Sequence, residues 1–190
     1  MGRIVITEFI SLDGVIEDPG GAEGFRHGGW TFEFTAGPDG DKFKLEETLG
    51  AEALLLGRVT YDGFAAAWPT MEGTGEFGEK MNGMPKYVVS STLEDPSWNN
   101  STVLRGDPAE TVARLKDEVD GELLVAGSAQ LAQALIDADL VDEIRLMVFP
   151  VVLGTGKRLF GATGDKKRMT LTRTQALGDG VSLQVFAPVR

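Results

Sequence analysis

The stretch ELLVAGSAQLAQALIDADLVDEIRLMVFPVVLG, residues 122–154, decides the fold class of this chain. Residues 122–127 form a short apolar run that predicts a buried strand. Ser128 then opens a segment through residue 140 that predicts a helix, and residues 141–154 predict a second strand, closed by a proline and a glycine. Two strands separated by a helix favour a parallel pair, because parallel strands need a long crossover connection.

The same alternation of strands and helices runs along the rest of the chain. Further strands are predicted at residues 3–10, 51–57, 86–92 and 101–106, and further helices at residues 40–50, 60–68 and 107–121. Glycine-rich residues 11–38 and 70–85 predict loops, the second with at most one turn. Two alternating runs, residues 168–177 and 181–189, predict a C-terminal hairpin. This order predicts an α/β fold whose mostly parallel sheet is covered on both faces and carries antiparallel strands at its C-terminal end.

Length and composition favour a soluble protein with a single globular domain. The 190 residues suffice for a sizeable core and predict a single domain over residues 1–190. The chain has no cysteine, which excludes disulfides, thiolate nucleophiles and cysteine-ligated metals. The formal net charge of -11 argues against broad nucleic-acid binding, which needs a basic surface. No apolar run approaches the ~20 residues of a membrane span and no signal-peptide core is found, so we expect a cytoplasmic protein without membrane partners.

The junction between the strand at residues 51–57 and the following helix carries the first candidate site. Gly57 lets the backbone approach a ligand closely, Arg58 can fork onto a phosphate, and Thr60 places a hydroxyl at a capping position. Free N–H groups at the start of a helix attract anions. The alternative for this junction is a capped helix with a solvated arginine.

Two further junctions have the same character. Ser90 and Ser91 follow the strand that begins at residue 86, where their hydroxyls can hold a phosphate or ribose or can simply cap a turn. Residues 126–128, Ala-Gly-Ser, separate a strand from a helix and permit a backbone approach to a pyrophosphate. Ligands of open α/β sheets bind at the carboxyl ends of the strands, so the junctions together predict a phosphate-bearing cofactor lying across that edge.

Hydrolytic and metal chemistry find little support. The only histidine, His27, lies in a glycine-rich loop, and no G-x-S-x-G motif is present, so we do not expect a Ser-His-Asp triad. No carboxylate spacing indicates a metal site. The turn at residues 154–158 carries Lys157 and Arg158, which we expect to be solvated.

Segments along nearly the whole chain resemble one family. The segments are ISLDGVIEDPGG (10–21), ALLLGRVTYDGF (53–64), KYVVSST (86–92), ELLVAGSAQLAQALIDADLVDEIRL (122–146) and FPVVLGTGKRLF (149–160). Their combination resembles the dihydrofolate-reductase-like superfamily. It is most similar to stand-alone proteins that look like the C-terminal reductase domain of bifunctional riboflavin-biosynthesis enzymes. The resemblance implies a three-layer αβα fold with a mostly parallel sheet of about eight strands that binds NADPH at its carboxyl edge.

The resemblance also implies roles for individual residues. Gly57, Arg58 and Thr60 would meet the cofactor phosphates, with Arg58 reading the 2′-phosphate, and Ser90 and Ser91 would flank the adenosine. The remaining implied contacts are Gly127, Ser128, Ala129 and Gln130 at the pyrophosphate and Ile16 beside the nicotinamide. The family often forms homodimers, which we also expect here.

Substrate residues are less clearly implied. Asp41, which lies sixteen residues before Gly57, is the best match to the substrate-binding acid of dihydrofolate reductases, and Asp13 is a second candidate for orienting substrate or relaying a proton. Lys42 and Lys44 are candidates for holding a substrate phosphate. The leading prediction is hydride transfer from NADPH to a heterocycle or a ribosylamino-pyrimidine. The alternatives are a pteridine reductase and a nucleotide-binding protein without turnover.

Overall fold

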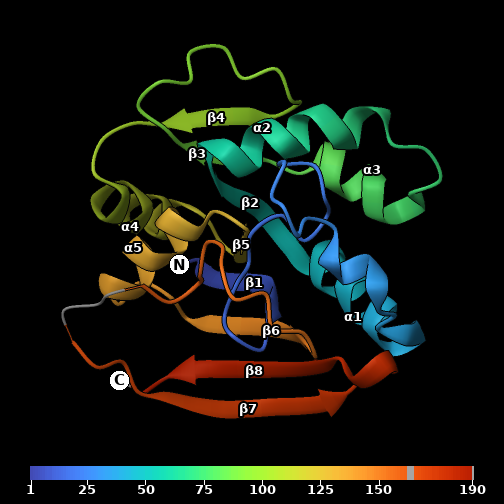
Figure 1. The fold of residues 1–190 in the computed structure, drawn as a ribbon. Coiled ribbons are helices and arrows are strands. Elements are labelled where there is room, and N and C mark those ends of the chain that lie inside the picture. Colours follow the sequence, from blue (N-terminus) through green and yellow to red (C-terminus); the bar gives the residue numbers. More distant parts are fainter. Residues whose placement is uncertain (162–164, 190) are drawn as a thin grey trace.

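The computed structural model describes residues 1–161 and 165–189 and has an α/β architecture (Figure 1). The strands are β1 Arg3–Ser11, β2 Ala51–Gly57, β3 Lys86–Val89, β4 Ser101–Leu104, β5 Glu122–Ala126, β6 Glu143–Phe149, β7 Met169–Ala176 and β8 Ser182–Pro188. The helices are α1 Gly37–Gly50, α2 Arg58–Ala67, α3 Gly75–Gly83, α4 Pro108–Glu118 and α5 Ala129–Asp137. Short 3₁₀ turns occur at Trp30–Glu33, Trp68–Thr70 and Gly178–Gly180.

All the strands join one eight-stranded sheet in the order β4-β3-β2-β5-β1-β6-β8-β7. β1 lies at its centre and pairs in parallel with both β5 and β6. β8 runs antiparallel to both β6 and β7, which confirms the predicted C-terminal hairpin. Parallel strands end at a common edge, so the residues that follow β1, β2, β3, β5 and β6 gather on one side of the molecule.

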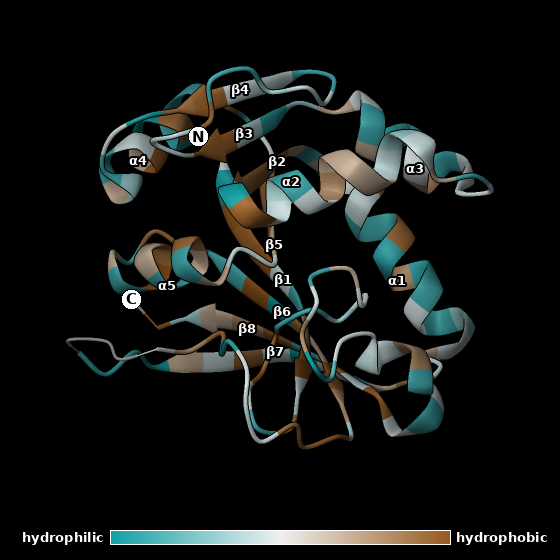
Figure 2. Cartoon of the chain, turned by 45° about the horizontal axis from the view of Figure 1, so that its top comes forward, coloured by the Kyte–Doolittle hydropathy of each residue, from teal (hydrophilic) through white to brown (hydrophobic). Residues whose placement is uncertain are grey.

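The two faces of the sheet pack against different helices, which makes three layers. Ile4 and Ile6 of β1 point into a core shared with α4 and α5, whereas Val5 between them points into a core shared with α2 and α3. This alternation is the period of two that a central strand buried on both faces requires. Figure 2 shows the apolar colour concentrated on the strands between the helices. No helix within the described residues is long and apolar enough to cross a membrane.

Helix α3 corrects the prediction of a loop over residues 70–85. Its glycines disfavour a helix locally, but Met81 is 4% exposed and packs into the core beneath α2. Phe77 stacks on Trp68 with ring centroids 5.3 Å apart. Gly78 is buried against the preceding turn, where a Cβ atom would lie 1.9 Å from the Thr74 hydroxyl oxygen. Tertiary packing therefore overrides the weak helical propensity of this segment.

Lys86 opens β3 with a fully buried side chain. Its Nζ donates to the Asn82 carbonyl at 2.7 Å and lies 4.3 Å from the centroid of the Trp98 ring. Burial lowers the pKa of Lys86 to about 8, because the charged form is poorly solvated there.

Replacing Lys86 by Met tests this burial. Between pH 8 and the ordinary lysine value of about 10.4, the unfolded chain binds more protons than the folded one, so the wild-type free energy of unfolding should rise with pH by up to about 3 kcal/mol relative to the variant. Urea unfolding at pH 7, 8, 9 and 10 measures this difference. The exposed Lys42→Met variant is the control and should track the wild type. A difference between wild type and Lys86→Met that does not change with pH would contradict the burial of a titrating amine.

Candidate functional site

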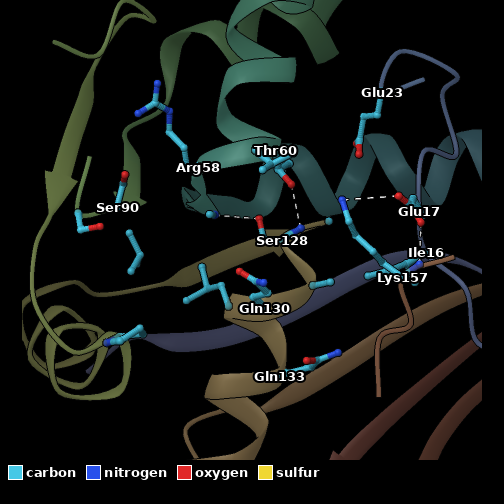
Figure 3. A pocket seen from close by; sticks show the side chains of 18 of the residues that line it. Ile16, Glu17, Glu23, Arg58, Thr60, Ser90, Ser128, Gln130, Gln133 and Lys157 are labelled. Atoms are coloured by element: carbon cyan, nitrogen blue, oxygen red, sulfur yellow. Dashed lines mark hydrogen bonds and ion pairs between the residues drawn. The ribbon is translucent and has the colours of Figure 1, made fainter. Parts of the chain in front are cut away.

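One cavity lies at the carboxyl edge of the sheet, with a volume of about 680 Å³ (Figure 3). Its wall combines the first turns of α2 and α5, the segment after β3, the loop after β1 and the turn after β6. Every residue predicted to contact a cofactor lines it: Ile16, Gly57, Arg58, Thr60, Ser90, Ser91, Gly127, Ser128, Ala129 and Gln130. The structure thus brings together residues that the sequence analysis drew from separate junctions.

The junctions after β2 and β5 are joined by side-chain hydrogen bonds. The Ser128 hydroxyl accepts from the backbone N–H of Gly57 at 2.9 Å and donates to the Ala126 carbonyl at 3.0 Å. In return, the Thr60 hydroxyl accepts from the backbone N–H of Ser128 at 2.9 Å. The hydroxyls of Thr60 and Ser128 therefore hold the two loops together, a role that the sequence did not indicate.

The turn after β5 has an unusual backbone. Gly127 and Ser128 are both left-handed, each with φ of 54°. A Cβ atom on Gly127 would lie 2.8 Å from the Thr60 hydroxyl oxygen, so glycine is required by both conformation and space. The left-handed backbone of Ser128 is strained, and the hydrogen bonds of its hydroxyl group offset the conformational free energy of that strain.

Replacing Ser128 by Ala should lower the free energy of unfolding by about 1–2 kcal/mol, because two hydrogen bonds are lost and the Gly57 N–H loses its partner. Chemical denaturation measures this change. Ser91→Ala alters an exposed serine on the same cavity and is the matched control. Equal stability of the two variants would show that the link between the junctions contributes nothing.

Arg58 lies at the rim of the cavity and is already paired. Its Nε donates to both carboxylate oxygens of Asp62, at 2.9 and 2.7 Å, and its side chain is 39% exposed. One terminal nitrogen also donates to the Thr92 hydroxyl at 3.4 Å. An anion at Arg58 would therefore meet a guanidinium whose charge is partly offset by Asp62.

The segment after β3 is a turn closed by Ser90. The Ser90 hydroxyl accepts from the backbone N–H groups of Thr92 and Leu93, at 3.2 and 3.1 Å. Ser90 therefore caps this turn, which is one of the two roles that its sequence position predicts. Arg105 holds the same turn by donating to the carbonyls of Ser91 and Leu93. The exposed Ser91 lines the cavity beside it.

The opposite end of the cavity contains two glutamates that the sequence analysis missed and a lysine that it assigned to a solvated turn. Glu17 and Glu23 come from the loop after β1, and Lys157 comes from the turn after β6. The Lys157 side chain is 55% exposed, as expected for a solvated turn; its backbone N–H donates to Glu17 at 2.8 Å and its Nζ lies 3.7 Å from the same carboxylate. Because β1 and β6 are neighbouring parallel strands, the segments that follow them must lie side by side. A correct prediction of this strand pairing would have brought Glu17, Glu23 and Lys157 together.

The two aspartates predicted as catalytic lie outside the described lining of this cavity. The Asp13 carboxylate accepts from the Ser11 hydroxyl at 2.7 Å and from the backbone N–H groups of Leu153 and Gly154. The Ser11 bond and the two backbone bonds lower the pKa of Asp13 to about 2, so it is an anion that ties the loop after β1 to the turn after β6. Asp41 is exposed on α1. Neither position supports a proton relay.

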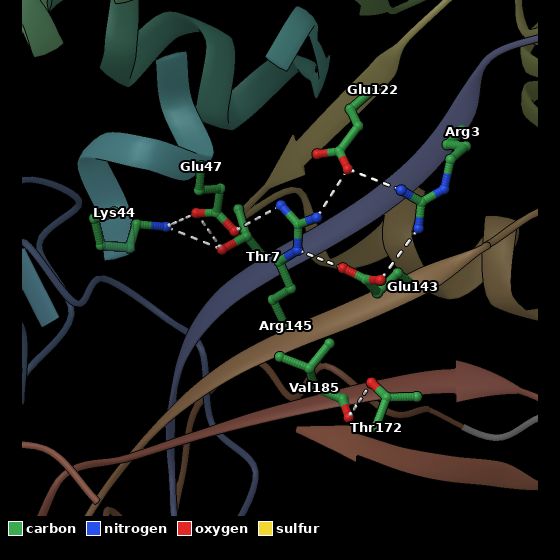
Figure 4. Close-up of polar contacts among 9 residues, drawn as sticks. All are labelled: Arg3, Thr7, Lys44, Glu47, Glu122, Glu143, Arg145, Thr172 and Val185. Atoms are coloured by element: carbon green, nitrogen blue, oxygen red, sulfur yellow. Dashed lines mark hydrogen bonds and ion pairs between the residues drawn. The ribbon is translucent and has the colours of Figure 1, made fainter. Parts of the chain in front are cut away.

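The two lysines of α1 are also engaged elsewhere. Lys42 is exposed, with its Nζ 3.7 Å from Glu46. Lys44 donates to Thr7 and pairs with Glu47, whose side chain is fully buried (Figure 4). On the far side of Glu47, Arg145 continues the network to the carboxylates of Glu122 and Glu143. Both lysines therefore lie outside the described lining of the cavity.

A buried carboxyl group lies directly beneath the turn after β5. Glu8 of β1 is 6% exposed, and it directly follows Thr7, which pairs with Ala126 of β5. Burial raises the pKa of Glu8 well above its ordinary value, although Lys44 acts in the opposite direction. Burial therefore favours the neutral form of this carboxyl group. Among residues 1–161 and 165–189, no group of acidic and histidine side chains is arranged to hold a metal ion.

Comparison with known proteins confirms the predicted resemblance. The family model of the RibD C-terminal domain matches residues 3–183. YyaP of Bacillus subtilis (strain 168), an uncharacterised protein, is 28% identical over 187 residues, which cover 97% of this chain and 94% of YyaP. A Shewanella sp. PV-4 protein named for riboflavin biosynthesis superposes with a TM-score of 0.76 at 20% identity, covering 99% of both chains. Dihydrofolate reductase from Enterococcus faecalis, solved with NADP(H), has a TM-score of 0.63 at 14% identity and shares the fold over 99% of this chain and 97% of its own.

Proposed function

Because the chain belongs to the RibD C-terminal domain family, we propose that it is an NADPH-dependent reductase. Its substrate class is a small heterocycle or a ribosylamino-pyrimidine such as 5-amino-6-(5-phosphoribosylamino)uracil. The main support for the proposal is that the starts of α2 and α5 and the glycine turn at Gly127 all line one cavity.

Both helix starts are suited to a pyrophosphate. Neither α2 nor α5 has a side-chain cap, and neither has an acidic residue in its first turn. Their first N–H groups are therefore available to an anion, and the helix dipoles favour negative charge there. At Gly127 a Cβ atom would lie 2.8 Å from the Thr60 hydroxyl oxygen, so glycine lets the starts of the two helices pack side by side.

The ends of the cavity differ, and this sets the orientation of the cofactor. Arg58, Ser90 and Ser91 would receive the adenosine and its 2′-phosphate, because Arg58 can present a guanidinium to a phosphate. Ile16, which is 5% exposed, would pack against the nicotinamide at the other end. NADPH supplies the hydride, and the protein supplies binding, orientation and exclusion of water.

Titration with NADPH tests the proposal directly. At 100 times the dissociation constant, binding should raise the free energy of unfolding by roughly 2.7 kcal/mol, which a thermal-shift assay resolves. NADPH oxidation in the presence of 5-amino-6-(5-phosphoribosylamino)uracil or dihydrofolate then separates the alternatives. Binding without turnover of any pyrimidine, pteridine or carbonyl compound would favour the nucleotide-binding protein, and turnover of dihydrofolate alone would favour a pteridine reductase. Absence of any shift with NADPH and with NADH would refute the proposal.

Arg58 and Asp62 together test how the cofactor is selected. Arg58→Ala should weaken NADPH binding about 10- to 100-fold and NADH binding little, because a charge-assisted contact to the 2′-phosphate is lost. Asp62→Asn should tighten NADPH binding, because the guanidinium is released from its carboxylate partner. Calorimetric titration of both variants with both cofactors measures these changes. Equal weakening of NADPH and NADH by Arg58→Ala would assign the arginine to the shared part of the cofactor.

The predicted homodimer and cytoplasmic location belong to the same proposal. Sedimentation of the purified protein measures the first of these.

A further inference from the structure

Glu17, Glu23 and Lys157 line the cavity at the end beside Ile16, and cofactor binding leaves them unused. Figure 3 shows Glu23 and Lys157 on the opposite side of Thr60 from Arg58, with the Glu23 carboxyl group turned toward the cavity. If the nicotinamide lies beside Ile16, the substrate atom that accepts hydride must lie near these side chains.

The loop that carries Glu23 is held in place by a buried aspartate. Asp18 is 2% exposed, and its two carboxylate oxygens accept from the backbone N–H groups of Glu23 at 3.0 Å and Phe25 at 3.1 Å. Trp30, also 2% exposed, donates its indole N–H to the carbonyl of Glu17 at 2.9 Å. The position of Glu23 over the cavity is therefore a property of the folded loop.

The two glutamates have different environments. Glu17 is held by the backbone N–H and the ammonium of Lys157. Within the described residues, the carboxyl group of Glu23 has no hydrogen-bond partner. Glu23 is exposed at the rim of the cavity, but desolvation by the surrounding loop still raises its pKa; the Lys157 charge opposes this, and the negative charges of Asp18 and Glu17 add to the increase. Glu23 thus retains a proton at higher pH than an ordinary glutamate.

From the place of Glu23 at the substrate end of the cavity, we propose that this residue donates the proton that completes reduction of the substrate. This inference rests on the proposed reductase function and extends it.

The step balances as follows. Reduction of a C=N or C=O bond adds hydride to the carbon and a proton to the nitrogen or oxygen. The hydride is supplied by the reduced nicotinamide, which is left oxidised. The proton comes from the O–H of Glu23, whose electron pair remains on the carboxylate, and water later returns a proton to it. A positioned acid of this kind contributes about 10²–10⁴-fold to a rate.

Glu23→Gln tests the inference, with Glu33→Gln as the matched control. Glu33 is exposed in the same loop and lies outside the described lining of the cavity. With 5-amino-6-(5-phosphoribosylamino)uracil or dihydrofolate, whichever is reduced, Glu23→Gln should lower kcat about 100-fold and leave the NADPH dissociation constant unchanged. The wild-type kcat should fall as pH rises through the pKa of Glu23, because the acid is then deprotonated, and the fall should be absent in Glu23→Gln. Full activity of Glu23→Gln would overturn the inference.

A second measurement needs no substrate. In protein labelled with ¹³C at the glutamate carboxyl groups and saturated with NADP⁺, the signal missing from Glu23→Gln identifies Glu23. Its pKa should exceed the ordinary value of about 4.3 and should rise further in Lys157→Met, where the opposing charge is gone. A value at or below the ordinary one, or no response to Lys157→Met, would overturn the inference. Failure of the wild type to bind NADPH would instead refute the reductase proposal itself, so the two failures are distinguishable.

Discussion

The reciprocal hydrogen bonds between the starts of α2 and α5 are the constraint on which the site depends. Ser128 reaches the N–H of Gly57, and Thr60 reaches the N–H of Ser128, each at 2.9 Å. These bonds join residues that are 71 and 68 positions apart in the chain. Without them, two helix starts would each be a weak attraction for anions. With them, both present their first turns to one ligand in a fixed relation.

The same constraint explains the backbone at the turn after β5. Two consecutive left-handed residues are uncommon, and one of them here is a serine. The conformation points the Ser128 hydroxyl at Gly57 and leaves no room for a side chain at Gly127. Local strain is thus retained because it builds the cavity wall.

Much of this architecture was predictable because its signals are local. Apolar runs and helix boundaries identified the parallel strands, the C-terminal hairpin and the junctions that line the cavity. The sequence did not reveal α3, because its stability comes from Met81 and Phe77 packing against distant residues. It could not show that Asp13 ties two loops together, because the hydrogen bonds of that carboxylate reach across 140 and 141 positions. Glu23 escaped notice, and Lys157 was assigned only to a solvated turn, for the same reason, since only the pairing of β1 with β6 brings their loops together.

The two ends of the cavity are built from different kinds of structure. The end with Arg58 rests on helix starts linked through Ser128, whereas the end with Glu23 rests on loops pinned by Asp13 and Asp18. Loops accept insertions and substitutions more readily than helix starts do. Under the proposed function, divergence among members of this fold can therefore change which molecule is reduced while the site of the nicotinamide cofactor stays constant. The loop after β1 is the part of the chain where a new substrate preference can evolve without rebuilding the rest.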